Sequence, residues 1–282
     1  MNHSETRYPD QAITISDQVD NSQWPLNSLL VSKKHRVIYT PIAKNANTTF
    51  KRLFVLLSGY PNPDEILNGE VHSYLTSHPT GLSLCDYTHK EAVEILHDDS
   101  YFRFVILRDP LTRITSAYLE KFVVNPLPVG KNGEAPGTIG SAIDWVYRNR
   151  DEQTDYERSI TFEEFINYVV NNNDLQLDVH FKSQDAYLKQ QSFDFLGALE
   201  KPDKIIELLE PRFNQKISLE DTNSLDRRKP FWRRRGQGRL LPAQLRAQRK
   251  LPHDGELLSK TIVMQLKERY LKDFELWQKA ME

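Results

Sequence analysis

The chain has 282 residues, of which 39% are hydrophobic, so it can bury one sizeable core or a core with a small subdomain. Its formal net charge of -2 provides no global field that would attract nucleic acid, and its one cysteine excludes an intrachain disulfide framework. No apolar run approaches the ~20 residues that a membrane-spanning helix needs, and the polar N-terminus lacks the pattern of a signal peptide.

The first clear element in chain order is a strand at residues 36–40, which are β-branched and aromatic and are followed by a proline. A polar loop at residues 42–47 comes next. Apolar residues then recur at helical spacing as far as Leu57, which predicts a helix capped by Asn47 or Thr48. This order of strand, tight loop and helix predicts a turn at which the helix N-terminus is accessible.

A helix N-terminus of this kind binds phosphate, because its first backbone N–H groups lack intrahelical partners and the helix dipole favours an anion. Lys44 adds a positive charge to the loop, and Asn47, Thr48 and Thr49 add short polar side chains. The loop lacks the glycines of the GxxxxGK[ST] pattern, which disfavours a nucleoside triphosphatase. By itself the segment is equally compatible with an ordinary strand-to-helix turn that carries an exposed lysine.

A second unit of the same kind consists of a strand at Phe102–Leu107 and a helix at residues 111–124. Arg108 stands at the carboxyl end of that strand, where α/β sheets bind ligands, and its guanidinium suits forked recognition of phosphate. Ser116 lies about two turns into the helix and can hydrogen-bond a phosphate oxygen. Arg108 alone could equally form a structural pair with Asp109, but two such units in one chain favour a ligand with two separated phosphates.

The rest of the chain alternates strands with helices, which predicts an α/β fold with a single domain and a mainly parallel sheet flanked by helices. Capping boxes begin helices at Thr88 and Thr161, and residues 193–199 are a third strand candidate. The further expected segments are a flexible leader (1–25), a domain (26–282), a long loop or lid (126–140), an arginine-rich basic loop (226–250) and a long amphipathic C-terminal helix (256–281).

These motifs resemble those of the carbohydrate sulfotransferases that use 3′-phosphoadenosine 5′-phosphosulfate (PAPS), in particular the branch of the chondroitin-type enzymes and their bacterial relatives. Residues 39–50 are similar to the family's loop for the 5′-phosphosulfate. Arg108, Asp109, Pro110, Arg113, Ser116, Ala117 and Tyr118 match its motif for the 3′-phosphate. Residues 177–184 and 193–200 resemble two further family segments, so that the resemblance covers about residues 35–200.

The chain departs from the family pattern within the first loop. Ile42 and Ala43 precede Lys44, whereas many relatives carry the lysine directly after the proline. Asn47 and Thr48 stand where relatives often have glycine or cysteine and threonine. The departures affect the identity of the individual donors more than the position of the loop.

The resemblance implies a P-loop-NTPase-like sulfotransferase fold and an enzyme that transfers a sulfuryl group from PAPS to a hydroxyl group of a carbohydrate or another acceptor. It implies no metal, and the sequence shows no ligand cluster with zinc-type spacing. The residues that the resemblance and the loop geometry together assign to the cofactor are Lys44, Asn45, Ala46, Asn47, Thr48, Thr49, Arg108, Ser116, Arg227 and Arg228.

Such a reaction needs a cation at the leaving group, which we assign to Lys44, and a general base for the acceptor hydroxyl. Histidine suits the base because its pKa lies near neutrality. His72 lies between the two phosphate units, where related enzymes place a catalytic histidine, and we rank it ahead of His180, which belongs to a family-like segment.

Two alternatives remain open at the level of sequence. A kinase-like nucleotide-binding protein would need a glycine-rich loop and a carboxylate for Mg²⁺ after a strand, and neither is found. A non-enzymatic module that binds anionic glycans through residues 226–250 would leave both phosphate units unexplained. The expected partners are a glycan or another hydroxyl-bearing acceptor rather than nucleic acid or a membrane, and without a membrane anchor we expect a cytoplasmic location.

Overall fold

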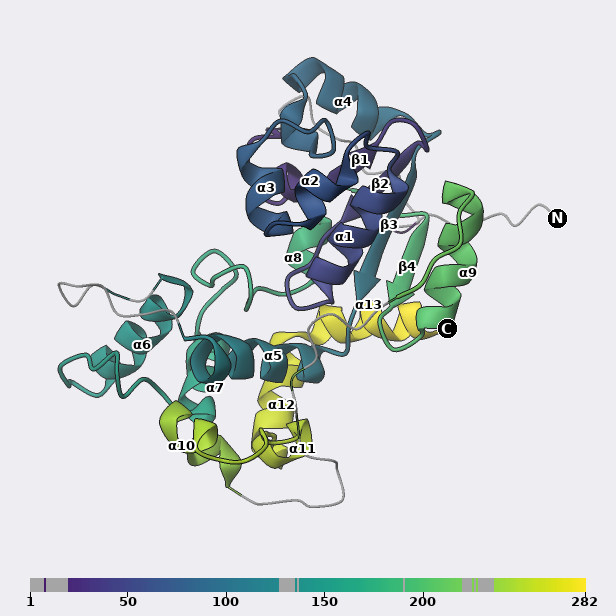
Figure 1. The fold of residues 1–282 in the computed structure, drawn as a ribbon. Helices are drawn as coiled ribbons and strands as arrows, with labels where there is room; N and C mark the ends of the chain where they lie inside the picture. The colour runs from purple at the N-terminus through teal and green to yellow at the C-terminus, as the bar shows by residue number, and fades with distance from the viewer. Residues whose placement is uncertain are drawn as a thin grey trace. The chain divides into compact units, whose positions relative to one another are not determined.

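The computed structural model describes residues 20–126, 137–189, 191–219 and 236–282, together with Tyr8, Ala135, Leu225 and Arg227. The chain forms two compact units, whose elements are labelled in Figure 1. The first unit comprises Met1–Arg108, Gln184–Asn223 and Glu275–Glu282, and the second comprises Asp109–Ser183 and Ser224–Phe274.

The first unit is built on a four-stranded sheet with the strand order β1-β2-β3-β4. β1 (Leu30–Ser32) runs antiparallel to β2 (Val37–Thr40). β2 pairs in parallel with β3 (Phe102–Leu107), and β3 pairs in parallel with β4 (Phe195–Ala198). The three strands expected from the sequence are therefore present, and the predicted α/β fold with a mainly parallel sheet is confirmed.

Helices connect these strands. In the first unit they are α1 (Asn47–Leu57), α2 (Pro63–Leu67), α3 (Val71–Ser77), α4 (His89–His97), α8 (Asp185–Leu188) and α9 (Pro202–Phe213), with 3-10 turns at Leu26–Ser28 and Leu84–Asp86. The last helix, α13 (Leu271–Met281), begins in the second unit and ends in the first.

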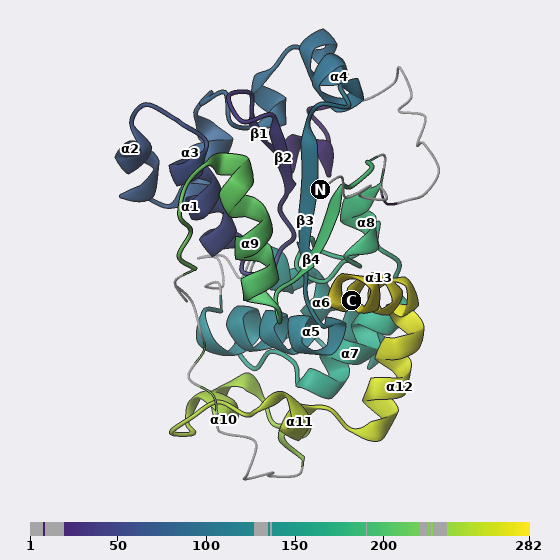
Figure 2. The ribbon, with the colours of Figure 1, turned by 90° about the vertical axis from the view of Figure 1, so that its right-hand side faces the viewer.

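Both faces of the sheet are covered by helices. Tyr39 and Phe104 pack with buried residues of α1 and α9 on one face, whereas Val105 and Leu107 pack with residues of α8 and of the end of α13 on the other. Figure 2 shows α1 and α9 on one side of the strands and α8 on the opposite side. Burial on both faces explains why β2 and β3 consist mostly of apolar residues rather than of alternating apolar and polar ones, with Arg103 as the one charged residue in them.

Among the residues that the structure describes, the second unit contains helices and connecting loops and none of the four strands. Its core stacks aromatic rings: Phe165 lies 5.2 Å from Phe122 and 4.9 Å from Phe181 between ring centroids. Its helices are α5 (Pro110–Tyr118), which continues as a π-helix over Leu119–Val124, then α6 (Gly137–Asn149), α7 (Phe162–Asn171), α10 (Pro242–Arg246), α11 (Asp254–Leu257) and α12 (Lys260–Arg269), with a 3-10 turn at Gln237–Arg239.

Both predicted capping boxes are confirmed. The Thr88 hydroxyl accepts the backbone N–H of Glu91, and the Glu91 carboxylate accepts the N–H of Thr88 at 3.0 Å. The same reciprocal pair links Thr161 and Glu164 at the start of α7. Each box satisfies two backbone donors that the first helical turn would otherwise leave without partners.

The prediction of one long C-terminal helix at residues 256–281 is wrong, because α11, α12 and α13 are separate. The break between the last two falls at Tyr270, whose φ is -113°. The Tyr270 side chain is buried, and its hydroxyl donates to the carbonyl of Phe181 at 2.5 Å. This tertiary contact interrupts a helical pattern that runs through the break without a sequence signal.

Three further predicted segments are only partly described. Of the leader, residues 1–7 and 9–19 lie outside the described residues, while Asn21 is buried and its Nδ2 donates to the Leu84 carbonyl at 3.0 Å. Of the expected loop at 126–140, residues 127–134 and 136 are not described, and its last four residues belong to α6. Within the basic segment at 226–250, residues 242–246 form α10.

Candidate functional site

The loop between β2 and α1 turns through two left-handed residues that are not glycine. Lys44 has a φ of 71° and Ala46 a φ of 52°. Ala46 is the N-cap of α1 and no side chain caps the helix there, so the predicted cap by Asn47 or Thr48 is wrong. A left-handed residue followed by helical ones directs successive backbone N–H groups to one point and forms an anion-binding nest. We call residues 44–49 the anion loop.

A histidine lies against this loop. The Nε2 atom of His72 is 2.9 Å from the Thr48 hydroxyl, and both residues are half-buried. His72 belongs to the first turn of α3, whose N-cap is Glu70; the Glu70 carboxylate accepts the N–H of Ser73 at 2.7 Å. The structure therefore brings the preferred catalytic histidine to the N-terminal end of α1, and it gives Glu70 a capping role in that arrangement.

Arg108 is joined to the same loop. Its Nη1 donates to the carbonyl of Lys44 at 2.8 Å. The contact follows from the parallel pairing of β2 with β3, since the carboxyl ends of parallel strands meet at one edge of a sheet. Two cations, Lys44 and Arg108, thus belong to the edge of the sheet at which the helix N-terminus of α1 lies.

The polar side chains of the anion loop differ in what they can offer a ligand. Asn45 is fully buried, and its Nδ2 donates to the carbonyl of Ile106 at 2.8 Å and to Oε1 of Gln184 at 2.6 Å, so it supports the loop from inside the protein. The Oδ1 atom of Asn47 is buried and has no hydrogen-bond partner among the described residues. A half-turn of that amide would present an N–H donor at the same position. Thr49 is half-buried in the first turn of α1.

The other predicted site residues belong to the second unit. Ser116 is buried in α5. The Nδ1 atom of His180 lies 2.6 Å from Oδ1 of Asp178, and Arg227 forms an ion pair with Asp254. Arg228 lies outside the described residues. The structure thus brings Lys44, Thr48, His72 and Arg108 together within the first unit, while the assignments of Ser116, His180, Arg227 and Arg228 stay predictions.

Lys51 is a cation near this site that the sequence did not single out. It lies three residues after Thr48 on α1, which places the two side chains on neighbouring positions of the helix surface. Burial lowers its pKa to about 8, although the negative charge of Glu70 acts in the opposite direction. Its spacing from Thr48 is the one sequence signal that could have indicated it.

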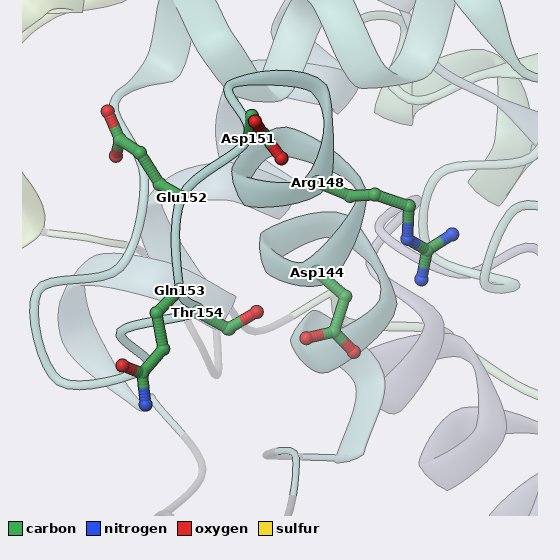
Figure 3. A pocket seen from close by; sticks show the side chains of 6 residues that line it. All are labelled: Asp144, Arg148, Asp151, Glu152, Gln153 and Thr154. Carbon is green, nitrogen blue, oxygen red and sulfur yellow. The ribbon is translucent and has the colours of Figure 1, made fainter.

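A shallow hollow on the second unit has the wrong charge for a phosphate site. Figure 3 shows its six lining side chains, of which three are carboxylates and one is a guanidinium. Like charges repel, so such a lining disfavours an anionic ligand. None of the predicted site residues is among those lining it: Asp144, Arg148, Asp151, Glu152, Gln153 and Thr154.

The described part of the chain contains no group of three or more His, Cys, Asp or Glu side chains that could hold a metal ion. None of its helices is both long enough and apolar enough to cross a membrane. The location of the protein in the cell stays a prediction.

Comparisons with curated proteins identify relatives that share part of their length with this chain. Carbohydrate sulfotransferase 10 of Pongo abelii is 32% identical over 176 residues, which are 61% of this chain and 46% of that protein. The human protein of the same name is 31% identical over 176 residues, again 61% of this chain and 46% of the relative. Carbohydrate sulfotransferase 14 of Mus musculus is 28% identical over 178 residues, 62% of this chain and 44% of the relative.

In each of these comparisons the matched part is less than half the length of the relative. No solved structure gives a significant match. A family model described as the sulfotransferase family, by contrast, matches residues 27–280. Because this match covers nearly the whole chain, the chain belongs to the sulfotransferase family.

Proposed function

We propose that the protein transfers a sulfuryl group from PAPS to a hydroxyl group of a carbohydrate. Membership of the sulfotransferase family supports the reaction class, and the names of the relatives support a carbohydrate acceptor. The observation that carries the proposal is the 2.9 Å contact between Thr48 and His72, because it brings a candidate general base to an anion-binding turn.

The residues of the first unit fit an anionic cofactor. The anion loop offers backbone N–H groups and the amide of Asn47, and Lys44 and Arg108 offer positive charge. When bound, PAPS would supply an activated sulfuryl group whose leaving group is adenosine 3′,5′-bisphosphate. Lys44 and the N-terminus of α1 then stabilise the negative charge that develops on the leaving phosphate, and Arg108 binds the 3′-phosphate.

His72 takes the proton of the acceptor hydroxyl in this proposal. When its Nε2–H donates to the Thr48 hydroxyl, Nδ1 carries the lone pair and is the basic atom. The Thr48 hydroxyl can donate as well as accept, so the contact holds the ring orientation of His72 and is compatible with either tautomer. A positioned base of this kind contributes about 10²–10⁴ to the rate.

The cofactor is tested by calorimetric titration of adenosine 3′,5′-bisphosphate into the wild-type protein and into Arg108→Ala. We expect micromolar binding to the wild type and at least about tenfold weaker binding to the variant, a loss of ~1.4 kcal/mol. Arg148→Ala is the matched control, because Arg148 is an exposed arginine that lines the acidic hollow. Absence of binding to folded wild-type protein would overturn the proposal.

The base is tested by comparing His72→Ala with His180→Ala in the transfer of labelled sulfate from PAPS to a panel of glycans. We expect His72→Ala to lose about two orders of magnitude or more in kcat, as for the removal of a general base. Its affinity for adenosine 3′,5′-bisphosphate should change by less than the affinity of Arg108→Ala does. A larger loss of kcat in His180→Ala would instead make His180 the base.

A further inference from the structure

The side chain of Gln184 replaces a strand partner for the peptide group of Arg108. Its Nε2 donates to the Arg108 carbonyl at 2.9 Å, and its Oε1 accepts the Arg108 N–H at 3.1 Å. Gln184 is fully buried and precedes α8, 76 positions after Arg108 in the chain. This two-point contact fixes the backbone at the carboxyl end of β3, at the residue that carries the guanidinium.

The same amide also holds the anion loop. Oε1 of Gln184 accepts a second hydrogen bond, at 2.6 Å, from Nδ2 of Asn45, which is itself fully buried. Nδ2 of Asn45 also donates to the carbonyl of Ile106 at 2.8 Å. One side-chain oxygen therefore joins the backbone of Arg108 to the residue that follows Lys44.

The orientation of both amides is determined by their neighbours. Only an NH₂ group can face the carbonyls of Ile106 and Arg108, so neither Asn45 nor Gln184 can be turned by 180° without facing oxygen to oxygen. The guanidinium of Arg108 closes the network by donating to the carbonyl of Lys44. Because the side chains of Asn45 and Gln184 are fully buried, breaking a hydrogen bond that they make would leave a polar group with little solvent to replace its partner.

We propose that Gln184 is a positioning residue that holds the anion loop and Arg108 at a fixed separation, so that two phosphate groups of one ligand are bound together. This inference rests on the proposed function. When two anion-binding elements are fixed before the ligand arrives, the second phosphate adds its contacts without a further cost for ordering the protein. Gln184 thereby acts through the loop and the arginine and needs no contact with the ligand.

The test compares two ligands that differ by one phosphate, adenosine 5′-monophosphate and adenosine 3′,5′-bisphosphate. The gain in affinity from the 3′-phosphate is measured by calorimetry for the wild type and for Gln184→Met, which keeps a side chain of similar length without hydrogen-bonding groups. We expect this gain to fall by about tenfold in Gln184→Met, while the affinity for the monophosphate falls less.

Gln191→Met is the matched control. Gln191 is also buried in the first unit, but its Oε1 accepts from the Thr40 hydroxyl at 2.7 Å and its Nε2 donates to the Tyr187 carbonyl at 3.0 Å. Replacing Gln191 by methionine also removes two hydrogen bonds of a buried amide, so it should lower the free energy of unfolding by a similar amount. It should leave the gain in affinity from the 3′-phosphate at the wild-type value. An equal fall in both variants, or no fall in Gln184→Met, overturns the proposal.

Two further measurements separate this proposal from the proposed function. If Gln184→Met does not fold, Asn45→Ala removes the hydrogen bond between the anion loop and Gln184. This variant should lower the gain in affinity from the 3′-phosphate in the same way. If wild-type protein binds neither nucleotide, the proposed function fails. Hydrogen exchange of the free protein then tests whether Gln184 joins the anion loop to Arg108. Faster exchange in both the anion loop and Arg108 on loss of Gln184 supports it, and faster exchange at Arg108 alone overturns it.

Discussion

Lys51 is charged at neutral pH although burial disfavours its ammonium form. The pKa is lowered from 10.5 to about 8, which corresponds to at most roughly 3 kcal/mol and to less than this because part of the side chain still contacts water. A folded protein gains nothing in stability from such a residue. Perturbed cations of this kind cluster at functional sites, and Lys51 follows Thr48 on the helix that begins at the anion loop.

Replacing Lys51 by methionine should therefore raise the free energy of unfolding at pH 7. The folded protein binds fewer protons than the unfolded chain between pH about 8 and 10.5, so the cost of the lysine is full below pH 8 and disappears as the pH rises to 10.5. Urea unfolding of wild type and Lys51→Met at pH 7 and pH 10 measures this. The stability difference should be large at pH 7 and small at pH 10.

The exposed Lys267 gives the control for this prediction. Lys267→Met makes the same chemical change without the burial, so its effect on the free energy of unfolding should be small at both pH values. A stability difference for Lys51→Met that is equal at pH 7 and pH 10 would show that the ammonium of Lys51 is not destabilised by burial.

At the scale of the element, the start of α1 depends on the left-handed conformation of Ala46. A β-branched residue is a steric outlier at positive φ, so Ala46→Val should displace the backbone N–H groups of the nest. We expect binding of adenosine 3′,5′-bisphosphate to weaken by about tenfold or more, as measured by calorimetry. Ala243→Val, on the exposed side of α10, is the control and should bind as the wild type does.

Elements with local signals could be predicted from the sequence. Each capping box at Thr88 and Thr161 lies within four residues, and β2 and β3 are short segments of mostly apolar, β-branched and aromatic residues, so both kinds of element can be predicted without knowledge of the fold. The break at Tyr270 could not be read, because its cause is a hydrogen bond to Phe181, 89 positions away in the chain.

Some features of the candidate site could likewise be predicted from the sequence and others could not. Lys44 and Arg108 follow strands and were placed by the rule that ligands bind at the carboxyl ends of parallel strands. The inward direction of the Asn45 side chain and the two-point contact of Gln184 with Arg108 depend on packing between segments 76 or more positions apart. The positive φ values of the anion loop were hidden because no glycine marks them.

At the scale of the whole molecule, the predicted cofactor residues are divided between the two units. Lys44, His72 and Arg108 belong to the first unit, and Ser116 and Arg227 belong to the second. This division makes the assignment testable by hydrogen exchange, because a ligand slows exchange in the segments that it contacts or orders.

Addition of adenosine 3′,5′-bisphosphate should protect amides of the anion loop and of residues 106–108 in the first unit, and amides of α5 near Ser116 in the second. Exchange measured with and without the nucleotide, followed by peptide mass spectrometry, gives the pattern. The helix α10, which contains none of the predicted cofactor residues, serves as an internal reference whose exchange should not change. Protection confined to the first unit would show that Ser116 and Arg227 take no part in binding.

The side chains on the two left-handed residues of the anion loop also affect the unfolded chain. Glycine at Lys44 and Ala46 would lose more backbone freedom on folding, at a cost of about 0.4–1 kcal/mol per position. With lysine and alanine at these positions, the chain loses less backbone entropy on folding, but the folded loop is sterically strained. Searches for phosphate loops that require glycine would overlook such a segment, whereas a search on backbone dihedral angles would recover it.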